Sequence, residues 1–147
     1  MAVPWAYIDT SVLLKRYLEE PGTAAARQIL RRYRVVSSAI TPLEAAAVLY
    51  RRRAGGDIAE ADFRAIVRRL AADRAHWELL DLTTEVLDKA EQVIHTTGVR
   101  TLDAVHLASA LTIQATSGQR QPTRLITGDA RQRDAAIGLG LHVTWVD

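Results

Sequence analysis

Cysteine is absent from this sequence of 147 residues. Its absence excludes disulfide bonds, thiolate metal sites and a cysteine nucleophile. Any metal site in the chain must therefore use oxygen or nitrogen ligands. A chain without cysteine also fits a reducing compartment, and we expect the protein to act in the cytoplasm.

Long hydrophobic runs are missing as well. No stretch approaches the roughly 18 consecutive apolar residues that a membrane-spanning helix requires. The first four residues, Met-Ala-Val-Pro, carry neither a basic segment nor a long apolar one, so we expect no signal peptide. The sequence therefore predicts no membrane partner.

Lysine is scarce, because Lys15 and Lys89 are its only occurrences, and arginine carries nearly all of the positive charge. The guanidinium group binds phosphate through two parallel N–H groups, so an arginine-rich surface suits nucleic acid. A GC-rich coding sequence would give the same bias without any function. At a net charge of only +2, we give that simpler explanation more weight.

The composition is otherwise that of a globular domain. Hydrophobic residues make up 48% of the chain and charged residues 24%. A chain of this length can bury one substantial hydrophobic core, and neither an internal repeat nor an interdomain linker divides it. We therefore predict a single domain over residues 1–147.

Apolar runs of strand length alternate along the chain with segments of helical periodicity. The predicted strands are, approximately, residues 3–9, 35–40, 77–82, 124–127 and 142–146. The predicted helices are, approximately, residues 12–18, 24–33, 42–54, 58–75, 85–97, 102–116 and 130–139. This alternation is typical of an α/β fold with a mostly parallel sheet of four to five strands and helices on both faces.

Four acidic residues stand where a strand ends or where a helix begins. They are Asp9, Glu44, Asp103 and Asp129. Asp9 and Asp129 are typical helix N-caps, and Glu44 can complete a capping box with Thr41. Asp103 lies in the first turn of its helix, where a negative charge favours the helix dipole. Taken singly, none of the four acids requires a catalytic explanation.

Taken together, the four acids indicate a metal site. In a parallel α/β sheet, the junctions from strand to helix lie along one edge. Four carboxylates on that edge would repel one another and raise one another's pKa values unless a cation neutralised them. Mg²⁺, with Mn²⁺ as its substitute, is the expected cation because both prefer carboxylate and water ligands. Such a cluster supports hydrolysis of phosphodiesters without a protein nucleophile.

Hydroxyl groups accompany two of these acids. Thr10 and Ser11 follow the first acid, and Thr127 precedes the last one by two residues. Such hydroxyls are able to orient waters or phosphate oxygens, but the ordinary roles of threonine and serine in caps and turns explain them equally well.

Four short motifs together resemble those of the PIN-domain nucleases. They are Ile-Asp-Thr-Ser at residues 8–11, Thr-Pro-Leu-Glu at 41–44, Leu-Asp-Ala-Val-His-Leu-Ala-Ser-Ala-Leu at 102–111 and Ile-Thr-Gly-Asp at 126–129. More narrowly, they resemble the VapC toxins of bacterial and archaeal toxin–antitoxin pairs. The likeness spans nearly the whole chain, with the motifs in order and at the usual spacing, and the third motif is the most specific.

The resemblance implies a fold and an activity. The fold would be a three-layer α/β/α sandwich, and the activity that of an endoribonuclease dependent on Mg²⁺ or Mn²⁺. The protein would form a homodimer. A cognate antitoxin protein, VapB-like or of another type, would neutralise it by placing its tail in the active-site groove.

The resemblance also assigns roles to individual residues. The catalytic positions fall on Asp9, Glu44, Asp103 and Asp129. Asp9 and Asp103 are the metal ligands that we favour, and the other two acids are further candidates. Thr10 and Thr127 match auxiliary hydroxyl positions.

Basic and imidazole side chains near the acids give two further predictions. Arg131 and Arg133 follow the last acid, and we expect them to contact RNA phosphates, which dominate nonspecific affinity. His106 lies three residues after the third acid. We expect it to pack at the helix surface rather than to act in catalysis, because a catalytic histidine must reach its target.

Other classes of function stay open at this point. In a binding module without catalysis, the acids are helix caps and the arginines bind RNA or a protein without cutting it. A phosphatase of the haloacid dehalogenase type requires a second aspartate two residues after the first acid, where this sequence has Ser11. A response-regulator receiver requires a late lysine, and none follows Lys89. Both phosphotransfer folds therefore match poorly.

Overall fold

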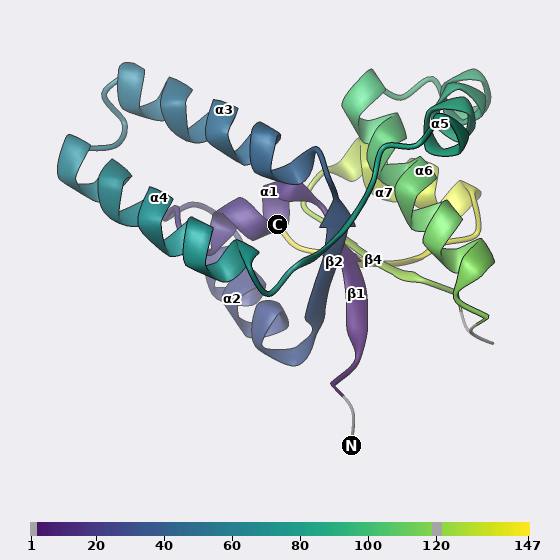
Figure 1. The fold of residues 1–147 in the computed structure, drawn as a ribbon, viewed down its shortest axis with the longest axis horizontal. Helices are drawn as coiled ribbons and strands as arrows, with labels where there is room; N and C mark the ends of the chain where they lie inside the picture. Colours follow the sequence, from purple (N-terminus) through teal and green to yellow (C-terminus); the bar gives the residue numbers. More distant parts are fainter. Residues whose placement is uncertain (1–2, 119–121) are drawn as a thin grey trace.

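The computed structural model describes residues 3–118 and 122–147, and it contains a sheet of five parallel strands (Figure 1). The strands are β1 (Trp5–Ile8), β2 (Arg34–Ser38), β3 (Glu78–Leu80), β4 (Arg124–Thr127) and β5 (His142–Trp145). The helices are α1 (Thr10–Lys15), α2 (Thr23–Arg32), α3 (Thr41–Ala54), α4 (Glu60–Arg74), α5 (Thr84–Thr97), α6 (Thr101–Thr116) and α7 (Ala130–Gly138). The predicted alternation and the α/β class are confirmed.

Strand β1 lies at the centre of the sheet, whose order is β3-β2-β1-β4-β5. Tyr7 of β1 pairs with Val36 of β2 on one side and with Leu125 of β4 on the other. Residues 6–8 are fully buried, because helices cover both faces of the central strands, and this explains the unbroken apolar run in the sequence. Since the strands run in the same direction, their carboxyl ends meet at one edge.

Helices cover both faces of the sheet (Figure 1). On one face, α5, α6 and α7 pack against Tyr7, Val36 and Leu125. On the other face, α1 and α2 pack against Ile8 and Ile126. The predicted three-layer α/β/α sandwich is therefore confirmed. None of the helices in the described residues combines the length and the apolarity that crossing a membrane demands.

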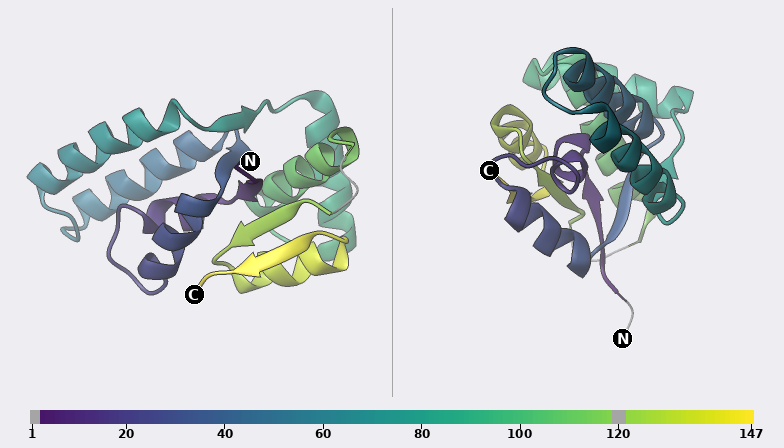
Figure 2. Two further views of the ribbon diagram at one scale, coloured as in Figure 1. Left: turned by 90° about the horizontal axis from the view of Figure 1, so that it is seen from below. Right: turned by 90° about the vertical axis from the view of Figure 1, so that its left-hand side faces the viewer.

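Helices α3 and α4 form a hairpin that extends beyond the sheet (Figures 1 and 2). We call residues 41–74 the α3–α4 hairpin. It has a hydrophobic cluster of its own, in which Ala45 and Leu49 of α3 pack with Leu14 and Leu18, while side chains of α4 complete the cluster from outside. The hairpin is thus attached to the sandwich through α1 and through the residues that link β2 to α3.

Candidate active site

The carboxyl edge of the sheet brings the four acidic residues together. Asp9 follows β1 directly, Asp129 follows β4 after one residue, Glu44 lies in the first turn of α3, and Asp103 lies in the first turn of α6. The charges of Asp9, Asp129 and Glu44 all raise the pKa of Asp103, so the four carboxylates are close enough to interact.

Asp9 is the most deeply buried of these acids, with 3% of its surface exposed. Its Oδ1 accepts hydrogen bonds from Ser11 Oγ at 2.6 Å and from the Val12 amide at 3.2 Å, which makes it the N-cap of α1. Its Oδ2 accepts a short hydrogen bond from Thr127 Oγ1. Burial raises the pKa of Asp9, and the bonds from Ser11 and Thr127 oppose that rise.

Thr127 connects Asp9 to a buried glutamine. Its hydroxyl has one proton, which goes to Asp9, and it accepts from the Asp129 amide at 3.1 Å. Gln132 Oε1 lies 3.0 Å from the same hydroxyl, whereas Gln132 Nε2 is buried without a partner. A half-turn of the side-chain amide lets Nε2 donate to Thr127, because a hydroxyl oxygen has two acceptor positions. Gln132 then donates a hydrogen bond to Thr127, and Thr127 donates one to Asp9.

Glu44 is held by a network from two other elements. Its Oε1 accepts from Thr10 Oγ1 at 2.7 Å and lies 2.6 Å from His106 Nε2. His106 Nδ1 lies 2.7 Å from the hydroxyl of Tyr7. The capping box considered for Glu44 is not formed: Ile40 takes the N-cap position, without a side-chain cap bond.

The prediction for His106 was wrong. Its side chain does not pack at the helix surface; the residue is only 3% exposed and faces the acid edge through Glu44. The sequence signal was available, since residues three apart on a helix lie on nearly one face and His106 is three residues from Asp103. Gln132 was missed for a different reason, because nothing in its local pattern separates it from a surface glutamine.

Asp103 differs from the other acids because its carboxylate accepts no hydrogen bond from any residue in the described part of the chain. Its pKa is raised by partial burial, then by the charges of Asp129, Asp9 and Glu44, and the nearby His106 opposes this rise. A carboxylate in this position carries uncompensated negative charge. It is therefore the acid that a cation would stabilise most.

Asp129 is the N-cap of α7, and the helix-capping role predicted for it from the sequence is confirmed. Its Oδ1 accepts from the amides of Arg131 at 2.8 Å and Gln132 at 3.3 Å. Its Oδ2 accepts no hydrogen bond within residues 3–118 and 122–147. Capping therefore uses one oxygen and leaves the other available, so a capping role and a role in the site are compatible.

The donor set fits a hard divalent cation. In the described residues, no group of three or more histidine, cysteine, aspartate or glutamate side chains is arranged so that it could hold a metal ion. Mg²⁺ does not need such a group, since it keeps several waters and binds through one or two carboxylates. The oxygen-only chemistry of Asp9 and Asp103, and the repulsion that raises the pKa of Asp103, match such an ion.

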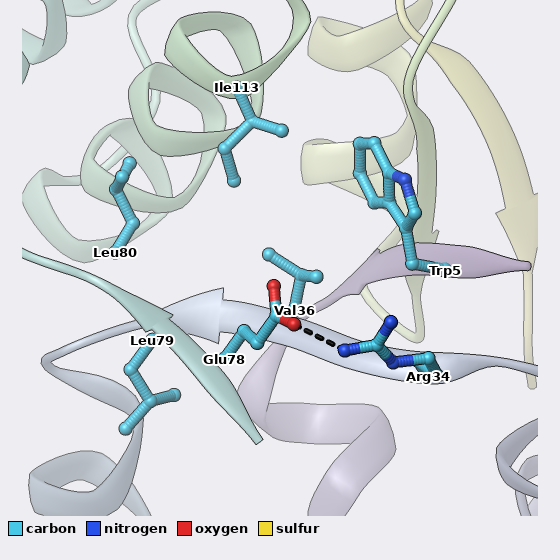
Figure 3. A pocket seen from close by; sticks show the side chains of 7 residues that line it. All are labelled: Trp5, Arg34, Val36, Glu78, Leu79, Leu80 and Ile113. Carbon is cyan, nitrogen blue, oxygen red and sulfur yellow. Dashed lines mark hydrogen bonds and ion pairs between the residues drawn. The ribbon is translucent and has the colours of Figure 1, made fainter. Parts of the chain in front are cut away.

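Two hollows open among the elements that carry the acids; Glu44 lines the first, and none of the four acids lines the second. One, of about 300 Å³, is lined by Thr10, Ser11 and Glu44 and continues over apolar residues to Glu20 and Arg52. The other, of about 490 Å³, lies between the end of α5 and α7. A third pocket, of about 250 Å³, lies by the starts of β1 and β2 (Figure 3), far from the acid edge along the strands.

The two predicted RNA-binding arginines differ in their surroundings. Arg133 Nε donates to Asp134 at 2.9 Å, and its guanidinium lies 4.4 Å from the ring centre of Trp145. Arg131 lines the hollow beside α7, and its guanidinium forms no ion pair with the residues that the structure describes. Arg131 is thus free to meet a ligand, whereas Arg133 already has two partners.

Comparisons with known proteins find similar proteins over nearly the whole chain. The chain is 37% identical to ribonuclease VapC46 of Mycobacterium tuberculosis over 138 residues, which cover 93% of this chain and 94% of the relative. Among solved structures, FitAcB from Neisseria gonorrhoeae has a TM-score of 0.68 at 18% identity, covering 94% of this chain and 95% of the other. A toxin–antitoxin complex from Klebsiella pneumoniae has a TM-score of 0.65 at 17% identity, with 95% of both chains covered.

A protein-family comparison places the acids within a known domain. The family described as PIN domain matches residues 6–138, which include β4, all of β1 except Trp5, and all four acids of the edge. The solved structures are too distant in sequence to add more than the fold, and that fold agrees with the observed sandwich. The chain is a member of the PIN-domain family.

Proposed function

We propose that this protein is a metal-dependent endoribonuclease that hydrolyses RNA phosphodiesters and acts as the toxin of a type II toxin–antitoxin pair. The observation that carries this proposal is the meeting of four carboxylates at one sheet edge, where three of them raise the pKa of Asp103. The relative that is 37% identical over nearly the whole chain is a ribonuclease by name, which supports RNA as the substrate.

Asp9 and Asp103 are the residues that we expect to hold the ion, with Glu44 and Asp129 contributing a carboxylate oxygen each. A bound Mg²⁺ or Mn²⁺ ion would supply neutralisation of the negative charge that builds up on the phosphate oxygens. Without a cation, four acids would repel an RNA phosphate. Ser11 and Thr127 orient Asp9 by donating hydrogen bonds to its two oxygens, and these bonds oppose the rise that burial causes in the pKa of Asp9.

No protein nucleophile is required in this mechanism. The hydroxyls nearest the acids are already committed, since Thr10 donates to Glu44 and Ser11 to Asp9. Water is then the nucleophile. A carboxylate of the acid edge would accept its proton, and Asp103, whose oxygens accept no hydrogen bond from the described residues, would hold the ion.

The partners follow from the same proposal. Arg131, which has no ion-pair partner among the described residues, would contact an RNA phosphate beside the site. A cognate antitoxin would neutralise the protein, as the toxin–antitoxin complex among the similar folds suggests by analogy. Exposed Leu43, Tyr50 and Val67 on the α3–α4 hairpin give the homodimer an apolar surface on which to form.

An RNA-cleavage assay tests the nuclease proposal. The purified protein is expected to cut RNA with Mg²⁺ or Mn²⁺ and to stop in chelator. Asp9→Asn and Asp103→Asn should each lower the rate at least a hundredfold, because both remove charge from the proposed ion site. Asp62→Asn, on the exposed side of α4, is the matched control and should cut normally.

The outcome also separates this proposal from a binding module without catalysis. Cleavage that continues in chelator, or unchanged in both site variants, would contradict the metal-dependent mechanism. Co-expression with the protein encoded by an adjacent short reading frame tests the toxin role. Growth arrest by the wild-type protein should be relieved by that partner and be absent from Asp103→Asn.

A further inference from the structure

We propose that His106 is a positioning residue that holds Glu44 by one carboxylate oxygen and ties the α3–α4 hairpin to the acid edge. The proposal rests on the proposed function only in treating Glu44 as one of the working acids. The contacts that carry it are those of His106 with Glu44 and Tyr7, and of Thr10 with Glu44.

The direction of the hydrogen bonds follows from Glu44. A carboxylate oxygen accepts and does not donate, so His106 Nε2, which lies 2.6 Å from Glu44 Oε1, carries a ring proton and donates it. The other ring nitrogen, Nδ1, is then the acceptor for the hydroxyl of the fully buried Tyr7, which lies 2.7 Å away.

Glu44 consequently has two different oxygens. Oε1 receives protons from both His106 Nε2 and Thr10 Oγ1, at 2.6 and 2.7 Å. Oε2 receives none from residues 3–118 and 122–147. One oxygen anchors the side chain in a single rotamer, and the other stays available to a ligand. An unanchored glutamate would lose rotamer freedom when it bound a ligand. Because Glu44 is already anchored, ligand binding does not have to pay this entropy cost.

The two donors come from the elements that carry the other acids. Thr10 is the neighbour of Asp9 at the start of α1, and His106 lies nearly one turn after Asp103 on α6. Glu44 comes from the α3–α4 hairpin, which has a separate hydrophobic cluster. His106 and Thr10 thus fix Glu44 relative to Asp9 and Asp103. A histidine that only filled space in the core would not need a hydrogen bond to a carboxylate, which His106 makes with Glu44.

Nitrogen NMR of the whole, metal-free protein tests the bonding directly. Long-range ¹H–¹⁵N spectra distinguish a protonated ring nitrogen from a bare one. We expect a protonated Nε2 and a bare Nδ1 on His106, and we expect Glu44→Gln to shift the Nε2 signal more than that of Nδ1. A proton on Nδ1 with a bare Nε2 would overturn the proposal, since His106 could not then donate to Glu44.

Binding of Mn²⁺ to metal-free protein, followed by electron paramagnetic resonance, tests the consequence. His106→Phe keeps the ring volume but has no donor, and it should weaken Mn²⁺ binding about 10- to 100-fold. His106→Gln supplies a donor close to the position of Nε2 and should recover most of that loss. Thr112→Val is the control, because the Thr112 hydroxyl, farther along the same helix, donates to the Ala108 carbonyl.

The possible results lead to different conclusions. Unchanged Mn²⁺ affinity in a folded His106→Phe, or equal loss in the Phe and Gln variants, would overturn the positioning role. If His106→Phe does not fold, the NMR measurement on the wild-type protein still decides the donor. If the wild-type protein binds no Mn²⁺, the proposed function fails, whereas the nitrogen signals still show whether His106 holds Glu44.

Discussion

Individual residues at the acid edge perform two tasks at once. Asp9 and Asp129 cap the helices that follow them, each through Oδ1. Capping sets the direction of the carboxylate, because the first turn of the helix holds one oxygen in place. The other oxygen of Asp129 accepts no hydrogen bond from the described residues, and that of Asp9 accepts one from Thr127. A helix cap at a strand end is thus a means of aiming an acid, and a capping role is no argument against a catalytic one.

Asp103→Asn should stabilise the metal-free protein while removing its activity. The pKa of Asp103 is raised above its ordinary value of 3.8, so the folded protein holds this proton more tightly than the unfolded chain. The stability that this tighter proton binding contributes is fully present below the ordinary pKa, and it is lost as the pH rises through the raised pKa. At neutral pH, asparagine removes the cost of burying the charge and the repulsion from the other acids, and it should add less than about 1 kcal/mol to the free energy of unfolding, because solvent screens this partly exposed group.

Thermal unfolding at several pH values measures this effect. The difference between Asp103→Asn and the wild-type protein should shrink below the ordinary pKa, where both side chains are neutral. Saturating Mg²⁺ should raise the wild-type melting temperature but not that of the variant. A variant less stable than the wild type in chelator at pH 7 would contradict the repulsion described for this site.

Thr127→Val should destabilise the fold by roughly 1–3 kcal/mol, because it leaves one oxygen of buried Asp9 without its donor and the Asp129 amide without its acceptor. Valine has nearly the same shape as threonine, so the loss reports hydrogen bonding rather than packing. Urea unfolding measures it. Thr116→Val, where the exposed hydroxyl bonds only to carbonyls of its own helix, should change stability by less than about 0.5 kcal/mol.

The acids of the site could be predicted from sequence, whereas most of their supporting side chains could not. Asp9 and Asp129 stand out because a strand and a helix meet at each of them. Tyr7 bonds to His106, which is distant in sequence, and Gln132 lies beside Thr127 across the junction from β4 to α7. No local sequence pattern marks either residue. His106 occupied the correct helical spacing, but the choice between a core position and the helix surface depended on how α6 packs.

At the scale of elements, the junction from β4 to α7 is the tightest part of the site. A Cβ atom on Gly128 would lie 3.1 Å from the carbonyl oxygen of Val146 and 3.3 Å from Ser11 Oγ. The Gly128 amide also donates to Ser11 Oγ at 3.3 Å, and Ser11 in turn donates to Asp9. A side chain at this position would therefore disturb the support of Asp9 as well as the packing.

Gly128→Ala should cost about 1–3 kcal/mol of stability, because the neighbouring backbone has to move. Gly138→Ala is the matched comparison in the last turn of α7. Nothing lies within 4 Å of a Cβ atom built there, and alanine should stabilise the helix by about 0.4–1 kcal/mol. Chemical unfolding of both variants gives the comparison, and equal effects of the two would contradict the close approach at Gly128.

The elements were predicted more accurately than their packing. Strand and helix periodicities located all five strands, because each is a short apolar run between polar turns. The end of α1 was placed too late, at Leu18 rather than Lys15. Here the chain tightens, with amides bonding to carbonyls three residues back, and the Thr23 hydroxyl binds the Leu18 carbonyl. Such a stop depends on a contact with the turn that follows, which the helical pattern does not contain.

At the scale of the whole molecule, Arg131 and Arg133 form a natural pair for testing the RNA-binding surface. Arg131→Ala should weaken binding of uncut RNA and lower the slope of log affinity against log salt by about one phosphate contact. Arg133→Ala should leave RNA binding unchanged and lose about 0.5–1 kcal/mol of stability with its contact to Trp145.

Both arginine variants are best measured in the Asp103→Asn background with chelator, so that binding is separated from cleavage. Fluorescence anisotropy of a labelled RNA at several salt concentrations gives the slope. An equal loss of affinity in the two variants would show that positive charge alone decides RNA binding. The contacts of Arg133 with Asp134 and Trp145 would then have no effect on it.

The α3–α4 hairpin has a consequence for how the site changes with time. Helix α4 has no fully buried residue, and the hairpin packs against Leu14 and Leu18, in α1 and just after it, rather than onto the sheet. We expect hydrogen exchange of its amides to proceed through a local opening that requires less free energy than opening of β1 or β4. Glu44 belongs to that opening unit, whereas Asp9, Asp103 and Asp129 do not. The edge would then alternate between a closed state with all four acids together and an open state without Glu44. A partner that binds the hairpin in one of these states would raise the population of that state.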